Sequence, residues 1–505
     1  MTVGSLAIVL HAHLPFVRHP EHPVFLEEDW LFEAITETYI PLARMMERLL
    51  AEEVPFRLTM TMSPPLCEML VDPLLKERYR RHVGELLEKV RKERGRMGSR
   101  FAPVMDLHER MFSESLDYVG RNDLTAAFRR IQESGALEII TSGATHGFLP
   151  FVLDPRPQIR AAVANYRKHF GRAPRGIWLP ECAYAPGLDR VLADNSIEFF
   201  FLDAHGVLNG SRVPKYGVHA PIRTPAGPAA FARDYETSKQ VWSSKEGYPG
   251  DANYREFYRD LGWDTGLGRN LGIKLHRITG EVELHAKEPY DPEAARRKAV
   301  EHAWHFKFHR EQQVRSLGAR LGRPPLIVAP YDAELFGHWW FEGPVFMEAL
   351  FRAMAHSDLS LTHPPEVLGR ADRIQTLEPA ASSWGNKGYY EVWLNSTNDW
   401  IYRHQRLVEA RMGELARREP GSDLERRALA QAARETLLLQ SSDWAFIMDT
   451  GAVASYAHKR FKEHAVRFTR LWEMVRAGGI DGGFLDDCEG KTSIFQELDY
   501  RVFRP

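Results

Sequence analysis

The sequence predicts an α/β protein whose parallel strands are followed by a C-terminal region made of helices. Short apolar runs recur along residues 1–370, and helical stretches lie between many of them. Alternating strands and helices are typical of a parallel sheet, either open or closed into a barrel. The pattern changes near Trp400, and from there the periodicity is mostly helical.

The expected strands share one pattern, which is a short apolar run bounded by Gly, Pro or Ser and followed by polar residues. Such runs are typical of strands that are buried on both faces of a parallel sheet. In chain order they are Leu6–Leu10, Phe56–Met62, Leu137–Thr141, Gly176–Leu179, Ile197–Leu202 and Leu326–Ala329. The helices expected between them include Leu31–Glu52, Glu77–Arg94, Leu124–Glu133 and Gln158–His169.

The middle and the end of the chain differ from this alternation. Residues 205–275 are rich in Gly, Pro, Tyr and charge, and a long irregular segment inside a compact domain tends to be functional. In the last third, Ser422 and Glu425 form a capping box that marks a helix start, and Pro420-Gly421 precedes it. We therefore expect an α/β unit over 1–370 and a helical domain over about 371–505, with helices at Ile401–Glu419, Ser422–Trp444 and Val453–Arg476.

Composition excludes several classes of protein. The 505 residues include 66 basic and 68 acidic side chains, so the formal net charge of −2 argues against nucleic-acid and anionic-membrane partners. The N-terminus lacks the features of a signal peptide, and no run approaches the roughly 18 apolar residues of a spanning helix. We expect a cytoplasmic protein. Three cysteines without a CxxC pair argue against a disulfide framework and against a cysteine zinc site.

Chemistry is expected at the ends of the strands, because reactive groups in parallel α/β folds gather there. Each position taken alone also has an ordinary structural explanation, such as a helix N-cap for a single Asp. That explanation weakens when most strand ends carry such groups. The residues concerned are His11 and His13, His146, Glu181, Asp203 and His205, and Asp332 and Glu334.

Two carboxylates on one rim, flanked by histidines and aromatics, suit the chemistry of glycosidic bonds. One carboxylate attacks or stabilises the anomeric carbon, and the other protonates the leaving oxygen. Aromatic residues make up 11% of the chain, and indole rings stack on the apolar faces of sugars. We expect core packing for Trp304 and Trp472, which lie in helical patterns. Eight tryptophans lie in more polar contexts or beside the motifs: Trp30, Trp263, Trp339, Trp340, Trp384, Trp393, Trp400 and Trp444.

A metal site is the main rival to this interpretation. His302, His305 and His309 share one face of an expected helix, although a solvated face explains them better. His11 and His13 together with Asp332 are also compatible with a hydrolase metal centre, and spacing alone leaves this open. The sequence has no phosphate-binding loop of the GxxxxGK[ST] type, and Cys182 has no identifiable base.

The motifs LHAHLPF, GATHGFLP, IWLPECAY and PYDAELFGHWWFEG, followed by SSWGNKG, resemble those of glycoside hydrolase family 57 in their order. The resemblance runs from residue 5 to about 450, and it is strongest to the members that act as 1,4-α-glucan branching enzymes. It implies an incomplete (β/α)7 TIM-like barrel with a small inserted domain and a C-terminal α-helical domain. The implied boundaries are 1–183 and 226–370 for the two barrel parts, 184–225 for the insertion and 371–505 for the helical domain.

The resemblance also implies roles for individual residues. Glu181 matches the nucleophile of a retaining mechanism and Asp332 the general acid/base, and retention places two such carboxyl groups about 5–5.5 Å apart. Loop 231–251 resembles a mobile active-site loop, with Tyr235 the first candidate for a lid residue and Tyr248 the second. The other implied substrate contacts are His11, His13 and His146 in the donor subsite, Trp263, Trp384, Trp393 and Trp30 along the glucan groove, and Asp443 and Trp444 from the helical domain.

The function expected from the resemblance is branching of an α-1,4-glucan, without a cofactor and in a protein favoured to be a monomer. Three alternatives stay open. One is a family 57 α-amylase or 4-α-glucanotransferase, which forms no α-1,6 bonds. Another is a metal-dependent hydrolase that uses His11, His13 and Asp332. The last is a catalytically silent glucan-binding protein.

Overall fold

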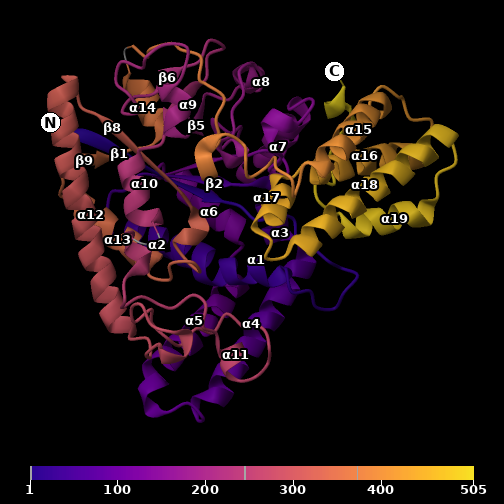
Figure 1. The fold of residues 1–505 in the computed structure, drawn as a ribbon. Coiled ribbons are helices and arrows are strands. Elements are labelled where there is room, and N and C mark those ends of the chain that lie inside the picture. The colour runs from indigo at the N-terminus through magenta and orange to yellow at the C-terminus, as the bar shows by residue number, and fades with distance from the viewer. Residues whose placement is uncertain (1–2, 244–245, 372, 505) are drawn as a thin grey trace.

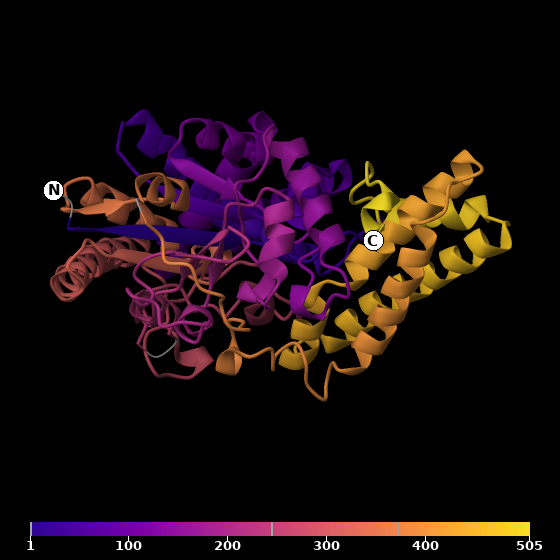
Figure 2. The same ribbon diagram turned by 90° about the horizontal axis from the view of Figure 1, so that it is seen from above.

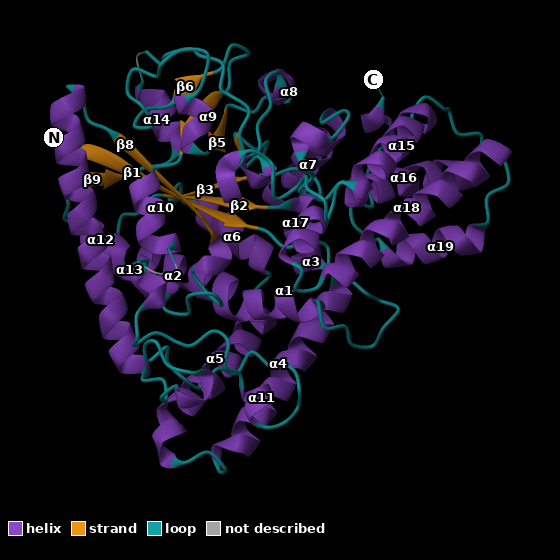
Figure 3. Ribbon diagram, in the orientation of Figure 1, coloured by secondary structure: helices purple, strands orange, loops and turns teal. Residues whose placement is uncertain are grey.

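The computed structural model describes residues 3–243, 246–371 and 373–504, and it shows a mixed α/β fold with a helical C-terminal region (Figure 1). The strands lie at the centre of the α/β region and helices surround them (Figure 3). Each expected apolar run contains a strand, because these residues are buried and form the cores of two sheets. None of the helices in the described ranges is both long enough and apolar enough to cross a membrane.

The first sheet is built around β1 (Gly4–Ala12), which is parallel to each of its neighbours. On one side β1 pairs with β2 (Leu58–Met62), which in turn pairs with β3 (Leu137–Ile140). On the other side it pairs with β8 (Leu326–Asp332). The short strand β9 (Leu359–Leu361) pairs with Gly4–Leu6, the first residues of β1. Burial on both faces explains why these strands are almost continuously apolar.

The second sheet has the order β4-β5-β7-β6. Its strands are β4 (Gly176–Ile177), β5 (Phe199–Leu202) and β7 (Ala229–Ala232), which are parallel, and β6 (Ile222–Arg223), which is antiparallel to β7. The segment 184–225, expected as an inserted domain, supplies β5, β6, α8 (Leu188–Asp194) and α9 (Ala204–Leu208). Its apolar residues share one core with β4 and β7.

The two sheets meet at both of their sides. On one side Thr141, just after β3, forms a parallel bridge with Ile177 of β4. On the other side the Asp234 N–H, just after β7, donates a 2.8 Å hydrogen bond to the Val328 carbonyl of β8. The carboxyl ends of the parallel strands therefore surround a common area.

Helices cover the sheets as the strand–helix alternation predicts. The expected helix 31–52 is present, but a π-helical turn, η1 (Ile35–Tyr39), divides it into α1 (Glu28–Ala34) and α2 (Ile40–Ala51). Such turns are frequent at functional sites. The remaining helices of this region are α3 (Pro64–Val71), α4 (Pro73–Arg94), α5 (Ala102–Arg121), α6 (Leu124–Glu133), α7 (Arg156–Phe170), α10 (Tyr235–Trp242), α11 (Leu261–Asp264), α12 (Pro292–Leu321), α13 (Gly343–Met354) and α14 (Pro364–Arg370).

The C-terminal helices form a body beside the α/β region (Figure 2). The expected helix 422–444 is two helices, because the chain turns at Gln440–Ser441 and the Ser441 side chain caps the second one. The Ser422 hydroxyl accepts the Glu425 N–H at 3.1 Å, as the capping box predicts. The helices are α15 (Trp400–Leu415), α16 (Asp423–Leu439), α17 (Ser442–Thr450), α18 (Ala454–Ala477) and α19 (Gly482–Lys491).

Residues 373–399 precede these helices and run along the α/β region. Ser382 forms an antiparallel bridge with Tyr184, and the Leu377 N–H bonds the Arg223 carbonyl at 3.0 Å. The helical body therefore begins at Trp400 rather than directly after 370, and the preceding segment contributes to the site described next.

Candidate active site

Polar side chains gather at the C-terminal ends of the parallel strands, where reactive groups in α/β folds collect. His11 near the end of β1 is paired in register with Asp332, the last residue of β8. Glu181 lies on a 3-10 turn, η4 (Pro180–Cys182), shortly after β4. His146 lies in the loop that follows β3. The fold thus brings four of the predicted residues to one edge.

The backbone of this edge is strained at three residues of the candidate site. Glu181, Cys182 and His146 have φ values of 62°, 49° and 56°, in the left-handed region that favours glycine. Each such residue costs about 1–3 kcal/mol, and such strain clusters at functional sites because the surrounding structure must hold it in place. The left-handed backbone at Glu181 and His146 lies outside regular strand geometry, and the two side chains lie close together at this edge.

The Glu181 carboxylate is held from both sides in one orientation. Its Oε2 accepts the indole N–H of Trp384 at 2.8 Å, and its Oε1 accepts the Ser442 hydroxyl at 2.8 Å. His146 Nδ1 lies 3.6 Å from the same Oε1. Only 8% of Glu181 is exposed, so these contacts replace most of the water that would otherwise solvate the charge.

Burial raises the pKa values of both predicted catalytic carboxyl groups. Burial raises the pKa of Glu181 to about 7, although the bonds from Trp384 and Ser442 act in the opposite direction. Burial, and then the charges of Glu334 and Glu181, raise the pKa of Asp332 well above its ordinary value. Burial therefore favours the protonated form of each group, and Glu181 ionises near neutral pH. Perturbed carboxyl pKa values of this kind are typical of catalytic sites.

Three histidines form a hydrogen-bonded and stacked cluster beside Glu181. His11 Nε2 lies 3.0 Å from His146 Nε2, and His146 Nδ1 lies 2.9 Å from the Ser442 hydroxyl. His13 stacks on His146 with ring centroids 3.8 Å apart and bonds Asp443 through Nε2 at 3.1 Å. Burial is the largest cause that lowers the pKa of His11 and of His146 well below the ordinary value, so both rings are neutral.

A metal-binding role is favoured by proximity but not by the bonding pattern. The ligand atoms of His13, His146 and Asp443 lie within 4.8 Å of one another. Both ring nitrogens of His146 are already in hydrogen bonds, as are those of His13, whose Nδ1 lies 2.9 Å from the Ser63 hydroxyl. The donor set therefore fits a protein-bonded cluster better than a metal centre.

Glu334 is a third carboxyl group at this edge. It is 3% exposed, and its Oε1 accepts the Tyr39 hydroxyl at 2.5 Å and the His13 N–H at 3.3 Å. Burial raises the pKa of Glu334 to about 7. Tyr39 is the last residue of the π-helical turn, so that turn contributes directly to the site.

The predicted aromatic contacts divide into two groups. Trp384 is half-buried and bonds Glu181, and Trp30 is half-buried with its ring edge-on to Tyr456 at 5.9 Å. Trp263 is 59% exposed, and Tyr235 is 71% exposed at the start of α10. Within the described ranges neither has a recorded hydrogen bond or ring contact with the histidine cluster or with Glu181.

Two other predicted substrate contacts lie in the core. Trp393 and Trp444 are each 1% exposed, and their rings pack against Phe148 and Tyr456. In this structure neither ring presents a face to a sugar, because neighbouring side chains cover it. Trp444 supports the site indirectly, since it directly follows Ser442 and Asp443. The core packing expected for Trp304 is wrong, because this residue lies on α12 and is 53% exposed.

Asp203 and His205 have structural roles instead of catalytic ones. The Asp203 carboxylate caps α9 by accepting the Ala204 N–H, and His205 Nε2 lies 2.7 Å from the Gly388 carbonyl. The ordinary explanation of a strand-end Asp as a helix cap holds at this position.

Sequence reasoning missed Ser442, Ser63 and Tyr39, and it noted Glu334 without giving it a role. The available signal for Ser442 was its place beside Asp443 in QSSDWAF, and for Glu334 its place in PYDAELF. Nothing in the sequence separates Ser63 or Tyr39 from ordinary residues after a strand or inside a helix.

Carboxyl groups with raised pKa values, neutral histidines and an indole at the rim of a parallel α/β fold are features expected of a glycoside hydrolase or transferase. Comparison with known proteins agrees. Residues 7–378 match glycosyl hydrolase family 57, and residues 404–503 match the C-terminal region of 1,4-alpha-glucan branching enzymes. The chain therefore belongs to glycosyl hydrolase family 57, and the resemblance seen in its motifs is confirmed.

Among the individual relatives, some are named branching enzymes and one is named an alpha-amylase. A 1,4-alpha-glucan branching enzyme of Thermococcus kodakarensis is 35% identical over 98% of this chain and 78% of the relative. The structure is similar to that of the alpha-amylase AmyC from Thermotoga maritima, with TM-score 0.93 and 44% identity over 100% of this chain and 99% of that one. A family 57 branching enzyme from Pyrococcus horikoshii gives TM-score 0.92 and 33% identity over 100% and 97%.

Proposed function

We propose that the protein is a 1,4-α-glucan branching enzyme, which cleaves α-1,4 bonds and transfers the released chain to a glucan 6-hydroxyl. The observation that carries the proposal is that residues 404–503, which resemble the C-terminal region of branching enzymes, contribute side chains to the site. Ser442 of this region bonds Glu181, and Asp443 bonds His13. The relative that is 35% identical, a 1,4-alpha-glucan branching enzyme, supports the proposal further.

The mechanism we infer is a retaining double displacement. The Glu181 carboxylate attacks the anomeric carbon while the bond to the leaving 4-oxygen breaks, and Asp332 gives its proton to that oxygen. In the second step Asp332 takes the proton of an acceptor 6-hydroxyl, whose oxygen attacks the anomeric carbon and releases Glu181. The raised pKa of Asp332 suits the role of the acid, because that group must hold a proton before the first step.

We further infer that the two sheets are parts of one incomplete (β/α)7 barrel. Its parallel strands in spatial order are β7, β5, β4, β3, β2, β1 and β8. The Thr141–Ile177 bridge supports continuity between β3 and β4. The hydrogen bond from Asp234 to Val328 is the corresponding contact between β7 and β8, where the barrel would otherwise stay open.

A lid role is proposed for loop 231–251, of which residues 244–245 lie outside the described residues. Its root is anchored, because the Asp234 side chain caps α10 and accepts from Gln313 of α12 at 2.9 Å. Tyr235 follows this anchor and is 71% exposed. Tyr248 is 7% exposed and bonds His305 at 2.8 Å, so it fastens the loop to α12. These contacts favour Tyr235 as the lid residue.

A second candidate function is an α-amylase, favoured by the 44% identity to AmyC. The two functions differ in what accepts the glycosyl group, which is a sugar hydroxyl or water. Incubation of the protein with amylose, followed by debranching and chain-length analysis, separates them. New α-1,6 bonds support branching, whereas reducing sugar without branches identifies the amylase.

Tyr235→Ala tests the lid within the same assay. We expect the variant to release several times more reducing sugar per branch formed than the wild type, because water reaches the glycosyl-enzyme more readily. Tyr258→Ala is the matched control, since Tyr258 is 73% exposed but lies outside the loop. An unchanged ratio in Tyr235→Ala would remove the lid role from this residue.

A further inference from the structure

Ser442 is the first residue of α17, yet it lies inside the α/β site. It is 2% exposed, and its hydroxyl lies 2.8 Å from Glu181 Oε1 and 2.9 Å from His146 Nδ1. Its backbone is fixed as well, because the Ser442 N–H donates to the His146 carbonyl at 2.9 Å and Ser441 forms a bridge with Gly147. The position of this hydroxyl is therefore set by main-chain contacts.

The chemistry of the partners sets the direction of every hydrogen bond in this chain. An ionised Glu181 can only accept, so the single proton of the Ser442 hydroxyl points to it. His146 Nδ1 must then carry a proton and donate to the Ser442 oxygen. A neutral imidazole has one N–H, so His146 Nε2 accepts from His11 Nε2 at 3.0 Å. That leaves His11 Nδ1 without a proton, and this buried atom indeed has no hydrogen-bond partner among the residues that the structure describes.

We propose that Ser442 is a positioning residue that orients the Glu181 carboxylate and directs a chain of hydrogen bonds from His11 through His146 onto it. The inference rests on the proposed role of Glu181 as the nucleophile. It makes the helical region an integral part of the catalytic site, because the hydroxyl at the end of the chain comes from α17.

The chain also suits the covalent step. When one carboxylate oxygen of Glu181 bonds the anomeric carbon, the other becomes an ester carbonyl oxygen, which still accepts a hydrogen bond. Ser442 therefore keeps its bond to Oε1, as a hydroxyl donor, when Oε2 is the atom that reacts. No proton has to move along the chain between the free enzyme and the intermediate.

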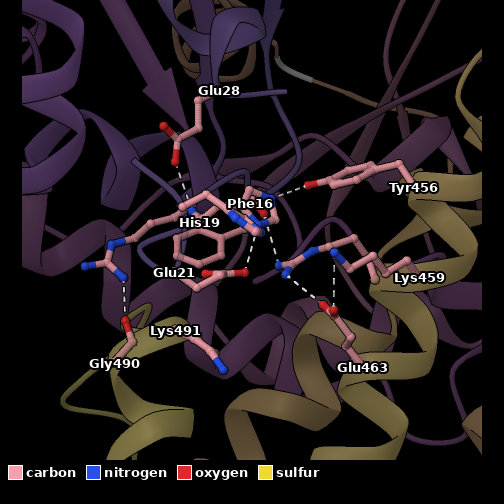
Figure 4. A network of polar contacts seen from close by, with 12 residues as sticks. Phe16, His19, Glu21, Glu28, Tyr456, Lys459, Glu463, Gly490 and Lys491 are labelled. Carbon is pink, nitrogen blue, oxygen red and sulfur yellow. Dashed lines mark hydrogen bonds and ion pairs between the residues drawn. The ribbon is translucent and has the colours of Figure 1, made fainter. Parts of the chain in front are cut away.

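The attachment of the helical region explains how such a contact is kept. Polar contacts join the loop after β1 to the helices α18 and α19 (Figure 4). His19 Nε2 lies 2.9 Å from the Tyr456 hydroxyl, and Arg18 donates to the Gly490 carbonyl at 2.5 Å. Arg460 is 2% exposed, and its guanidinium donates to the Phe16 carbonyl at 3.4 Å. These contacts hold the C-terminal helices to the chain segment that begins with His11 and His13.

The test is the pH dependence of kcat/KM on amylose for Ser442→Ala, Ser442→Thr and wild type. Hydrogen bonds to charged groups are strong enough that removing this one moves the acidic limb upward by about one pH unit. Ser442→Thr keeps a hydroxyl and restores the wild-type limb. Ser441→Ala is the matched control, since this neighbouring hydroxyl bonds Asp443 and not Glu181. An acidic limb in Ser442→Ala that coincides with the wild type would overturn the proposal.

If Ser442→Ala does not fold, a second measurement on the wild-type protein tests the proposal. Nitrogen NMR of the 15N-histidine-labelled wild type reports which ring nitrogen is protonated, with His146→Gln used to assign the signal. We expect the Nδ1–H form for His146, and the Nε2–H form would contradict the directed chain. Both readouts are independent of product linkage. If the wild type only hydrolyses amylose, the branching proposal fails while the role of Ser442 is still tested.

Discussion

Replacing Trp384 with phenylalanine removes the second side-chain donor to Glu181. The indole N–H lies 2.8 Å from Glu181 Oε2, and the ring packs edge-on against Trp178 at 5.0 Å. Phenylalanine keeps an aromatic ring at this place but has no N–H. A hydrogen bond to a charged group contributes about 1.5–3 kcal/mol, which corresponds to a pKa rise of about 1–2 units. Because Glu181 is 8% exposed, water compensates little of this loss.

The consequence for activity follows from the ionised fraction of Glu181. Its pKa is about 7, so at pH 6 roughly one tenth of the molecules carry the charged nucleophile. A rise of one unit reduces that fraction to about one hundredth, and kcat/KM at pH 6 falls about tenfold. The loss shrinks as the pH rises through the pKa of Glu181, because most molecules then carry the charged nucleophile.

The assay is the pH profile of kcat/KM on amylose for wild type and Trp384→Phe. Trp340→Phe is the matched control, because Trp340 is 1% exposed and its indole nitrogen bonds no atom in the described part of the chain. We expect the acidic limb to move upward only in Trp384→Phe. A uniform loss of activity at every pH, with the limb unmoved, would refute the reasoning and leave Trp384 with a role in binding alone.

Two predictions concern stability, measured by denaturant unfolding. The pKa of Glu181 is raised from 4.5 to about 7, so the folded protein loses stability as the pH rises through this window. Glu181→Gln should be inactive. It should be about 3 kcal/mol more stable than the wild type at pH 8, with no gain near pH 4. Arg255 and Glu37 form a buried pair, and Arg255→Met should cost about 3–5 kcal/mol at pH 7. Burial alone would raise the pKa of Glu37, but Arg255 lowers it from 4.5 to about 2, so this stabilisation is present above pH 4.5 and is lost as the pH falls toward 2. Equal stability of Glu181→Gln and wild type at pH 8, or a pH-independent effect of Arg255→Met, would contradict these assignments.

The strands and the edge that carries the chemistry were predictable because their causes are local. A strand buried on both faces must be apolar along its length, and the group that follows it must lie at the sheet edge. The run Leu6–Leu10 therefore predicted both β1 and the place of His11. Shorter strands were not predicted. For example, β7 is the four residues Ala229–Ala232, and three of them are alanine, which has a low strand propensity.

The aromatic residues show where local reasoning ends. Trp393 was assigned from the polarity of its neighbours and Trp304 from its helical pattern, but burial depends on what packs against a ring from elsewhere in the chain. Phe148 covers Trp393, which is 1% exposed, whereas Trp304 is 53% exposed on the long helix α12. A polar sequence context therefore did not distinguish a stacking surface from the core.

By itself the sequence determined the family, the parallel α/β region with helices after it, and the two carboxyl groups expected to react. Only the tertiary structure decided what surrounds them: the two donors that orient Glu181, the carboxyl of Glu334 whose charge raises the pKa of Asp332, and the hydrogen bond between His11 and His146. The reason is physical. Ser442 and Glu181 are 261 residues apart in the chain yet 2.8 Å apart in space, and such a contact follows from how helices pack against a sheet, not from any local pattern of residues.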